Sequence, residues 1–559
     1  MKQLLTIALS LLLLAGCTSK QAEMKKELAR FIHQHDSVLI PLYRQTALAS
    51  WDAAISGKAD DFQKAEELNL KMMALFSDKE KLKKLEEIKV SGLISDSLQL
   101  RQLDVLYRSF LMAKADTAKL NAMVRLGTVI EQKYNNFRTT VGGQKMSDNE
   151  VEKILRSSKD VKYQKEVWEA QKKIGAVVAD DIKKLVKLRN EVAASLGFKN
   201  YHDMSLTLSD QDPKEVRNIF NELDSLTKSA FASVKNDIDA YFIKYYNLKN
   251  TDELMPWNYQ NRFFQEAPRI YDVDLDKYYQ FQDLEALTST FYAGIGLPID
   301  DMLKNSDLYE KPGKNQHAFC TDIDNAGDVR VLCNVTPNTM WMNTMLHEFG
   351  HAVYDKNIDA TLPFVLRDPA HMFTTEAIAM MFGRFASNPQ WIRDMTGISE
   401  GEKMKIAENS FKSLRLEQLV FSRFAQVMYR FEKGMYENPD QDLNKLWWDL
   451  VEKYQLLKRP EGRNEPDWAT KIHIASYPCY YHNYLLGELL ASQLFYHITA
   501  NILKSDDYRF QSFVGNKNVG VFLKEKIFMP GNKWYWNELI EKATGEKLTA
   551  KYYARQFID

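Results

Sequence analysis

The chain has 559 residues, of which 45% are hydrophobic, and its formal net charge at pH 7 is −1. A chain of this length can bury a large core or several packed lobes. Because acidic and basic residues balance, the composition lacks the basic excess typical of nucleic-acid-binding proteins, and we expect no nucleic-acid partner.

Residues 1–16 have the pattern of a signal peptide. Lys2 precedes an apolar run from Leu4 to Leu14, which is too short to span a bilayer but fits a signal-peptide core. The run leads into Leu14-Ala15-Gly16-Cys17, which is similar to a bacterial lipobox. This similarity implies cleavage before Cys17 and an exported chain held at the cell envelope by a lipid anchor. The alternative is an ordinary secretory signal with a coincidental cysteine.

Most of the chain after the signal has the spacing of helices. Charged residues alternate with leucine, methionine and aromatic residues at helical intervals. The runs cover residues 23–56, 60–90, 95–115, 115–137, 147–197, 400–458, 481–503 and 534–544. Since we find no flexible linker, we expect one large, mostly α-helical domain over residues 17–559, which two lobes could form.

The one convincing strand region is a hairpin at about residues 316–335. Its turn, Asn325-Ala326-Gly327-Asp328, lies midway between Cys320 and Cys333, so these cysteines would lie opposite each other. In an exported chain they could form a disulfide, and two reduced cysteines are the alternative. His317 lies on the first predicted strand, whose exposed edge could bind a peptide by backbone pairing; the alternative for this residue is a surface histidine.

The segment His347-Glu348-Phe349-Gly350-His351 carries the clearest chemical signal. Thr336-Pro337-Asn338 is typical of a helix start, and the apolar residues that follow keep a helical spacing. Two histidines four residues apart stand on one helical face and can bind one Zn²⁺. Glu348 then lies where it can act as general base towards the attacking water. The alternative is a buried helix with two histidines that serve only packing.

A zinc site of this kind needs a third protein ligand and an open position for water. The next predicted helix begins near Thr374 and carries Glu376, an acid among apolar residues. We predict that Glu376 is the third ligand. The alternative is a carboxylate that only stabilises the helix N-terminus, and His371, just before the helix, is the competing ligand.

A second group of polar and aromatic residues follows near the C-terminus. Lys471 and His473 would face the same way on an extended segment. Tyr481 and Tyr484, at the start of an apolar helix, share one helical face. A phenol can donate a hydrogen bond to an oxyanion, and a lysine can hold a terminal carboxylate. The alternative is aromatic packing beside a solvated lysine.

These segments together resemble the angiotensin-converting-enzyme family of zinc peptidyl-dipeptidases and, more distantly, the thimet-oligopeptidase family. The similar segments are His317-Ala318, His347–His351, Leu362-Pro363, Leu366-Arg367, Glu376-Ala377-Ile378, Lys471–Ile474, Pro530–Trp534 and Thr544-Gly545. The resemblance implies a mostly α, elongated gluzincin fold with a deep central channel and a small β-element beside the zinc helix. It also implies an N-terminal helical lid over about residues 23–140 and a catalytic body over about 141–559.

The resemblance also implies roles for individual residues. It implies one zinc ion per chain, with His347, His351 and Glu376 as ligands. Glu348 would activate water and then pass a proton to the leaving amine, and Tyr484 would stabilise the oxyanion. The residues at substrate-binding positions are His317, Ala318, His473, Lys471 and Tyr481. Lys471 and Tyr481 would hold the C-terminal carboxylate together with a glutamine, for which Gln260 is the candidate.

Three departures from the family pattern stand out. The family's chloride-binding arginine between the two tyrosines is absent, because His482 and Asn483 stand there, which puts a dependence on chloride in doubt. Met380 occupies the position of an aspartate that orients a zinc ligand, and Asp355 could take over that role. The segment from Lys471 to Tyr481 is one residue longer than in the family.

The sequence therefore predicts a zinc metallopeptidase that removes dipeptides from the C-terminus of oligopeptides. We expect a monomer with oligopeptide substrates and a lipid anchor, exported to the cell envelope, on a membrane face that the sequence leaves open. The alternatives are an oligopeptidase that cuts internally and a non-catalytic peptide-binding lipoprotein.

Overall fold

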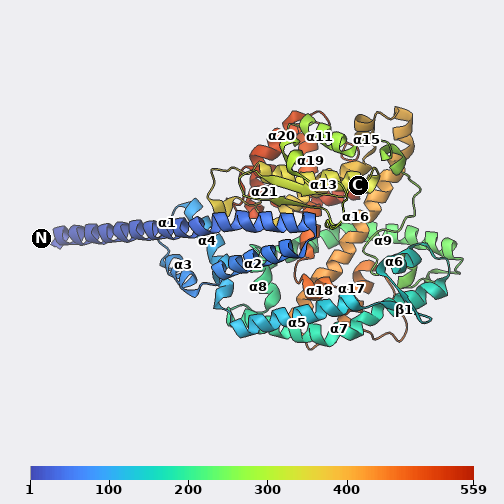
Figure 1. The fold of residues 1–559 in the computed structure, drawn as a ribbon, viewed down its shortest axis with the longest axis horizontal. Helices are drawn as coiled ribbons and strands as arrows, with labels where there is room; N and C mark the ends of the chain where they lie inside the picture. The colour runs from blue at the N-terminus through green and yellow to red at the C-terminus, as the bar shows by residue number, and fades with distance from the viewer. Residues whose placement is uncertain (1, 559) are drawn as a thin grey trace.

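The computed structural model describes residues 2–558, with side chains from Lys20 onwards. Helices make up most of the chain, and the strands form two small antiparallel hairpins (Figure 1). This confirms the predicted mostly α-helical fold. The side chain of Cys17 lies outside the described ones. Within residues 2–558, no helix is both long enough and apolar enough to cross a membrane.

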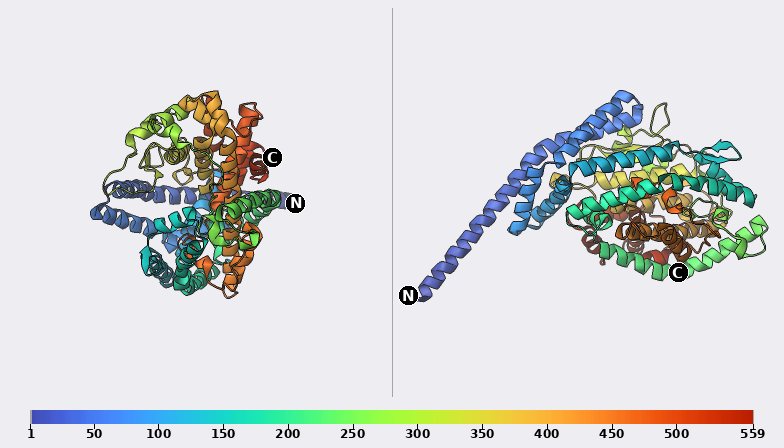
Figure 2. Two further views of the ribbon diagram at one scale, coloured as in Figure 1. Left: turned by 90° about the vertical axis from the view of Figure 1, so that its right-hand side faces the viewer. Right: turned by 90° about the horizontal axis from the view of Figure 1, so that it is seen from below.

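The N-terminal helices have a hydrophobic core of their own. They are α1 (Lys2–Ser56), α2 (Ala59–Phe76), α3 (Lys79–Ser91) and α4 (Ser97–Leu111). Residues of α1, α3 and α4, such as Phe31, Leu85 and Leu106, are buried against the short helix η4 (Phe364–Leu366) of the body. The first part of α1 projects from the rest of the molecule (Figure 2). This small core extends to Ala113.

The remaining helices pack around one large core. They are α5 (Thr117–Asn136), α6 (Asp148–Ser157), α7 (Val161–Ser195), α8 (Tyr201–Leu208), α9 (Pro213–Tyr246), α10 (Asp276–Tyr279), α11 (Leu284–Gly294), α12 (Asp300–Asn305), α13 (Thr339–Lys356), α14 (Met372–Gly383), α15 (Pro389–Thr396), α16 (Glu400–Glu437), α17 (Leu443–Gln455), α18 (His473–Ser476), α19 (His482–His497), α20 (Lys517–Leu523), α21 (Trp536–Thr544) and α22 (Lys551–Phe557). In Figure 1, α13 and α19 lie in the upper half and α5, α7, α17 and α18 in the lower half, while α16 runs between the halves.

The strands form two hairpins. They are β1 (Thr139–Val141) with β2 (Gln144–Met146), and β3 (Phe319–Asp322) with β4 (Val329–Leu332). In the second hairpin, Cys320 lies opposite Val331 and not opposite Cys333, and both cysteines are free thiols, so the possible disulfide is absent. His317 lies two residues before β3, in an exposed bend, so its predicted position on the strand is wrong.

The helix α4 is attached to the body by two arginines. Arg101 and Arg108 form ion pairs with Asp210, at 2.6 and 3.0 Å, in the loop between α8 and α9. Arg101 Nε also donates a hydrogen bond of 2.9 Å to the backbone carbonyl of Asn532. The N-terminal helices are therefore held against two separate loops of the body.

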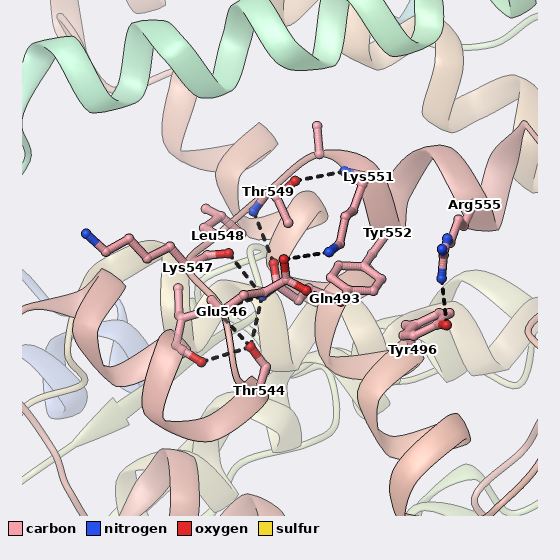
Figure 3. Close-up of polar contacts among 12 residues, drawn as sticks. Gln493, Tyr496, Thr544, Glu546, Lys547, Leu548, Thr549, Lys551, Tyr552 and Arg555 are labelled. Carbon is pink, nitrogen blue, oxygen red and sulfur yellow. Dashed lines mark hydrogen bonds and ion pairs between the residues drawn. The ribbon is translucent and has the colours of Figure 1, made fainter.

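The C-terminal segment is attached to α19 through Gln493 (Figure 3). The Gln493 amide donates to Thr544 Oγ1 at 2.9 Å and to the carbonyls of Glu546 and Lys547, and its oxygen accepts the Thr549 N–H at 3.1 Å. These bonds hold α21 and α22 against the helix whose first turn contains Tyr484.

Two glycines allow α13, α14 and α19 to pack closely. A Cβ atom at Gly350 of α13 would lie 2.8 Å from the Ala379 Cα of α14, closer than real Cβ contacts occur. A Cβ atom at Gly487 of α19 would lie 3.4 Å from Glu376 Cγ. At Gly350 the backbones of α13 and α14 meet, and at Gly487 the backbone of α19 meets side chains of α14, so α14 is held between α13 and α19.

We expect Gly350→Ala to lower the free energy of unfolding by roughly 1–3 kcal/mol, because the added methyl group forces α13 away from α14. Chemical denaturation measures this change. Gly127→Ala is the matched control: Gly127 also lies inside a helix, but nothing lies within 4 Å of its added Cβ. The control should gain about 0.5–1 kcal/mol from helix propensity. Equal stability of both variants would show that the contact at Gly350 does not limit packing.

Candidate metal centre

The structure brings the three predicted zinc ligands together. Asn338 caps α13 by accepting the Trp341 N–H at 2.9 Å, so the helix starts at the end of the predicted Thr336-Pro337-Asn338 segment and not at Thr336. His347 and His351 of α13 then face Glu376 of α14. Their Nε2 atoms lie 3.6 and 3.4 Å from the two Glu376 carboxylate oxygens. This is the one group in the described part of the chain whose ligand atoms lie close enough together to hold a metal ion.

The charge states of these side chains fit a zinc ion. Burial lowers the pKa of His347 to about 4, so its imidazole is neutral and can donate a lone pair. Burial opposes the charged forms of His351 and Glu376. Their mutual hydrogen bond and the attraction of neighbouring opposite charges together outweigh burial, which raises the pKa of His351 and lowers that of Glu376. Two imidazoles and one carboxylate are a ligand set that Zn²⁺ takes in catalytic sites.

His371, the competing ligand, has a structural role. Its Nδ1 accepts the Phe373 N–H at 3.2 Å and thereby caps α14. A ring nitrogen used in this way cannot also ligate a metal. His371 is also absent from the group of close ligand atoms, so the geometry favours Glu376.

The hydrogen-bond partner of His351 is a residue that the sequence analysis missed. Thr375 Oγ1 lies 2.8 Å from His351 Nδ1. Such a bond fixes the orientation of a metal-binding imidazole. Asp355, which we expected in this role, acts on His351 only through its charge. Because Thr375 directly precedes Glu376, one turn of α14 carries both the carboxylate and the group that orients the histidine.

Glu348 lies beside the three predicted ligands and is 9% exposed. Burial raises its pKa to about 7, while His351 and a backbone hydrogen bond from Cys320 act in the opposite direction. A carboxyl group with a pKa near neutrality can both accept and return a proton at physiological pH.

A cavity of about 880 Å³ opens above these residues. Ala318, Phe319 and Cys320 form one wall, so β3, which pairs only with β4, presents its free edge to the cavity. Val105, Arg108 and Ser109 of α4 form another wall. A second cavity of about 1320 Å³ shares Arg108, Leu208 and Asp210 with the first, so the two cavities adjoin, and we refer to them together as the channel. His317 does not line either cavity.

Lys471 is a buried cation that is packed among aromatic rings and lines neither of these two cavities. It is 7% exposed, and its Nζ lies 5.2–5.3 Å from the ring centres of Phe263, Phe424 and Tyr481. Its hydrogen bond goes to Gln265 Oε1 at 2.5 Å. Within residues 2–558, no carboxylate forms an ion pair with it. The ammonium group is therefore buried without an ion-pair contact, although the charge of the more distant Glu266 favours its charged form.

The structure corrects two expectations about this segment. Lys471 follows the short helix η6 (Asp467–Thr470) and His473 begins α18, so the segment is not extended. Tyr481 nevertheless contacts both residues: its ring centre lies 5.3 Å from that of the His473 imidazole and 5.2 Å from Lys471 Nζ. The glutamine next to Lys471 is Gln265, while Gln260 hydrogen-bonds with Tyr246. No local pattern marks Gln265, because 206 sequence positions separate it from its partner.

Tyr484 lies one helical turn before Gly487, where α19 touches Glu376. Burial raises its pKa, and the nearby charge of Glu376 adds to this effect. Its ring centre lies 5.4 Å from that of Tyr481 and 5.3 Å from that of Tyr480. Tyr480, which the sequence analysis did not single out, lines the same cavity as the predicted zinc ligands. The tyrosines thus connect Lys471 with the metal centre.

His482 and Asn483 form a neutral network. The His482 Nε2 lies 2.7 Å from Gln211 Oε1, and Gln211 Nε2 donates to Asn483 Oδ1 at 2.8 Å. Burial lowers the pKa of His482 well below its ordinary value, so the imidazole is uncharged. The position where the family carries a chloride-binding arginine therefore holds no cation.

The helical fold and the His–Glu–His arrangement beneath a channel define a metallopeptidase with a zincin-type site. A family model described as angiotensin-converting enzyme matches residues 22–555. The chain belongs to this family, peptidase family M2, and membership implies a zinc metallopeptidase.

Known relatives are distant. The angiotensin-converting enzymes of Mesocricetus auratus and Rattus norvegicus are each 23% identical over 68% of this chain. Those matches span 31% of the length of either enzyme, so the chain corresponds to about a third of these relatives. Carboxypeptidase 1 of Bacillus subtilis (strain 168) is 25% identical over 42% of this chain and 50% of its own length.

We expect Glu376→Ala to lose zinc on dialysis against a chelator, because two histidines alone hold the ion weakly. Metal analysis of the dialysed protein measures the loss. Glu348→Gln is the matched control: it should keep zinc and lower kcat by about 10²–10⁴-fold, since the amide cannot accept a proton. Zinc retention by Glu376→Ala together with zinc loss by His371→Ala would contradict the ligand assignment.

Proposed function

We propose that the protein removes dipeptides from the free C-termini of oligopeptides. The supporting observation is the ammonium group of Lys471, which is buried without an ion-pair contact in the described part of the chain. Burying an unpaired charge is costly, so such a group is typical of a site where a ligand supplies the opposite charge. A terminal carboxylate of a peptide has the charge and size to do so.

The neighbours of Lys471 suit a carboxylate. The three aromatic rings exclude water and fix the direction of the lysine side chain, which strengthens its attraction for an anion. The Gln265 amide group and the Tyr481 hydroxyl can add hydrogen bonds to the carboxylate oxygens. His473 Nδ1 is buried without a partner in the described part of the chain, and burial lowers the pKa of His473 to about 4. A neutral His473 can hydrogen-bond the substrate backbone.

The positions of these groups suggest how the reaction proceeds. Zinc, when bound by His347, His351 and Glu376, would polarise the scissile carbonyl and make water more acidic. Glu348 would take the proton of the attacking water and then deliver it to the leaving amine. Tyr484 would donate a hydrogen bond to the developing oxyanion. The free edge of β3, together with Ala318 directly before it, would hold the peptide backbone in place.

We also propose that the chain acts as a monomer, and that it is exported and lipid-anchored through Cys17. Native protein should partition into detergent and lack residues 1–16. Cys17→Ser should abolish the lipid and leave the activity of the purified protein unchanged. Partition of the Cys17→Ser variant into detergent, or a native N-terminus at Met1, would contradict the anchor.

We expect Lys471→Met to lower kcat/KM by roughly 10–150-fold on a hexapeptide with a free C-terminus, the loss of one charge-assisted hydrogen bond. Methionine keeps the packing against the aromatic rings. With the amidated hexapeptide, the variant and the wild type should be nearly equal. Mass spectrometry of the products tests the position of cleavage: dipeptides support the proposal, while single residues or internal fragments contradict it.

Two comparisons sharpen this test. Gln265→Met should reduce the preference for the free hexapeptide over the amidated one, whereas Gln260→Met should leave this preference unchanged. Burial also lowers the pKa of Lys471 to about 8. The charged form therefore dominates below about pH 8, and kcat/KM for the free-carboxylate peptide should fall above it. If kcat/KM fell equally for the free and the amidated peptide at high pH, the decrease would come from the titration of a group other than Lys471.

A further inference from the structure

Tyr480 is the one tyrosine in the described part of the chain that lines the cavity above the metal centre. His347, Glu348, His351 and Glu376 line the same cavity. Its ring meets that of Tyr484 edge to face, with the ring planes at 82°. Two phenols from consecutive turns thus lie on the same side of the metal centre.

The backbone around Tyr480 directs its side chain into this cavity. Cys479 has a φ of +56°, a left-handed conformation that non-glycine residues seldom adopt. The buried Glu432 holds this conformation, because its Oε1 accepts the Cys479 N–H at 2.8 Å. The Asn483 N–H then donates to the Tyr480 carbonyl at 2.9 Å. Such backbone strain is typical of functional sites.

Tyr480 and Tyr481 consequently serve different parts of the site. The ring of Tyr481 lies over Lys471 Nζ and beside His473. The ring of Tyr480 contacts that of Tyr484, and the negative charge of Glu376 raises the pKa of the Tyr480 hydroxyl. The reversal of direction between these two neighbours follows from the left-handed residue before them.

The Tyr480 hydroxyl has no hydrogen-bond partner within residues 2–558, and neither has that of Tyr484. Buried tyrosines that serve packing differ: Tyr279 donates to the Ala386 carbonyl at 2.7 Å, and Tyr553 donates to the Gln418 carbonyl at 2.6 Å. Burial, Tyr484 and Glu376 raise the pKa of Tyr480 to about 12, so its hydroxyl remains a donor at neutral pH. Tyr480 is half-buried, and its hydroxyl is absent from the buried atoms that lack a partner, so a ligand in the cavity can supply the acceptor.

We propose that Tyr480 is a catalytic residue, a second hydrogen-bond donor to the oxyanion that forms when water attacks the scissile carbonyl. The proposal rests on the proposed peptidase function and adds a residue to it. Tyr480 and Tyr484 would donate to the same oxygen, which has lone pairs for both. No proton leaves either phenol, because Glu348 carries the proton of the reaction.

The test is Tyr480→Phe, which removes only the hydroxyl. Loss of one oxyanion donor costs about 10²–10³-fold in kcat in other hydrolases. Since Tyr484 remains, we expect a loss of roughly 10–10²-fold in kcat with KM within about twofold of the wild type. A phosphinic peptide, which mimics the tetrahedral geometry, should bind the zinc-loaded variant more weakly by a similar factor in calorimetry. The product dipeptide should bind as before.

Tyr477→Phe is the matched control, because Tyr477 lies in the same loop but is 60% exposed. It should change kcat by less than twofold. The double variant Tyr480→Phe/Tyr484→Phe should be slower than either single variant. A double variant no slower than Tyr484→Phe would overturn the proposal.

Two further results would also overturn it. Weaker zinc retention by Tyr480→Phe with unchanged phosphinic-peptide affinity at saturating zinc would make Tyr480 a positioning residue for Glu376. A rise in KM alone would make it a substrate-binding residue. If the wild-type protein cleaves no peptide, the proposed function itself fails; if the wild type cleaves and Tyr480→Phe cleaves equally fast, only the role of Tyr480 fails.

Discussion

The close contact between α13 and α14 at Gly350 is the constraint on which the site depends. Because no side chain separates the helices there, the histidines of α13 lie within 3.6 Å of the Glu376 carboxylate on α14. Gly487 repeats this arrangement on the other side of α14, where α19 touches Glu376. The two helices that carry the predicted ligands are thereby held at the spacing that one metal ion requires, with α19 packed against the second.

Burial sets the charge states on both sides of the site. It raises the pKa of Glu348 to about 7 and lowers that of Lys471 to about 8, so each group changes charge near physiological pH. Burial also keeps His347 and His473 neutral. A neutral His347 can bind a metal ion, and a neutral His473 can hydrogen-bond a peptide group. The surrounding helices exclude water from these side chains, which disfavours their charged forms and shifts their pKa values.

The site takes its parts from both halves of the body and from the N-terminal helices. The helix α13, which carries two of the predicted zinc ligands, lies in the upper half of Figure 1, and α18, which follows Lys471 in the chain, lies in the lower half. Arg101 and Arg108 hold α4 over the channel through Asp210.

The sequence by itself determined the parts that depend on local geometry. The spacing of His347 and His351, the capped start of their helix, the next helix with Glu376, and the pairing of Tyr481 with Tyr484 all follow from helical periodicity. Tertiary structure decided the contacts between distant segments: Gln265 beside Lys471, Thr375 behind His351, and the direction of Tyr480. It also decided the register that separates Cys320 from Cys333. Periodicity describes one helix at a time, whereas these contacts arise where the packing of several elements determines which side chains meet.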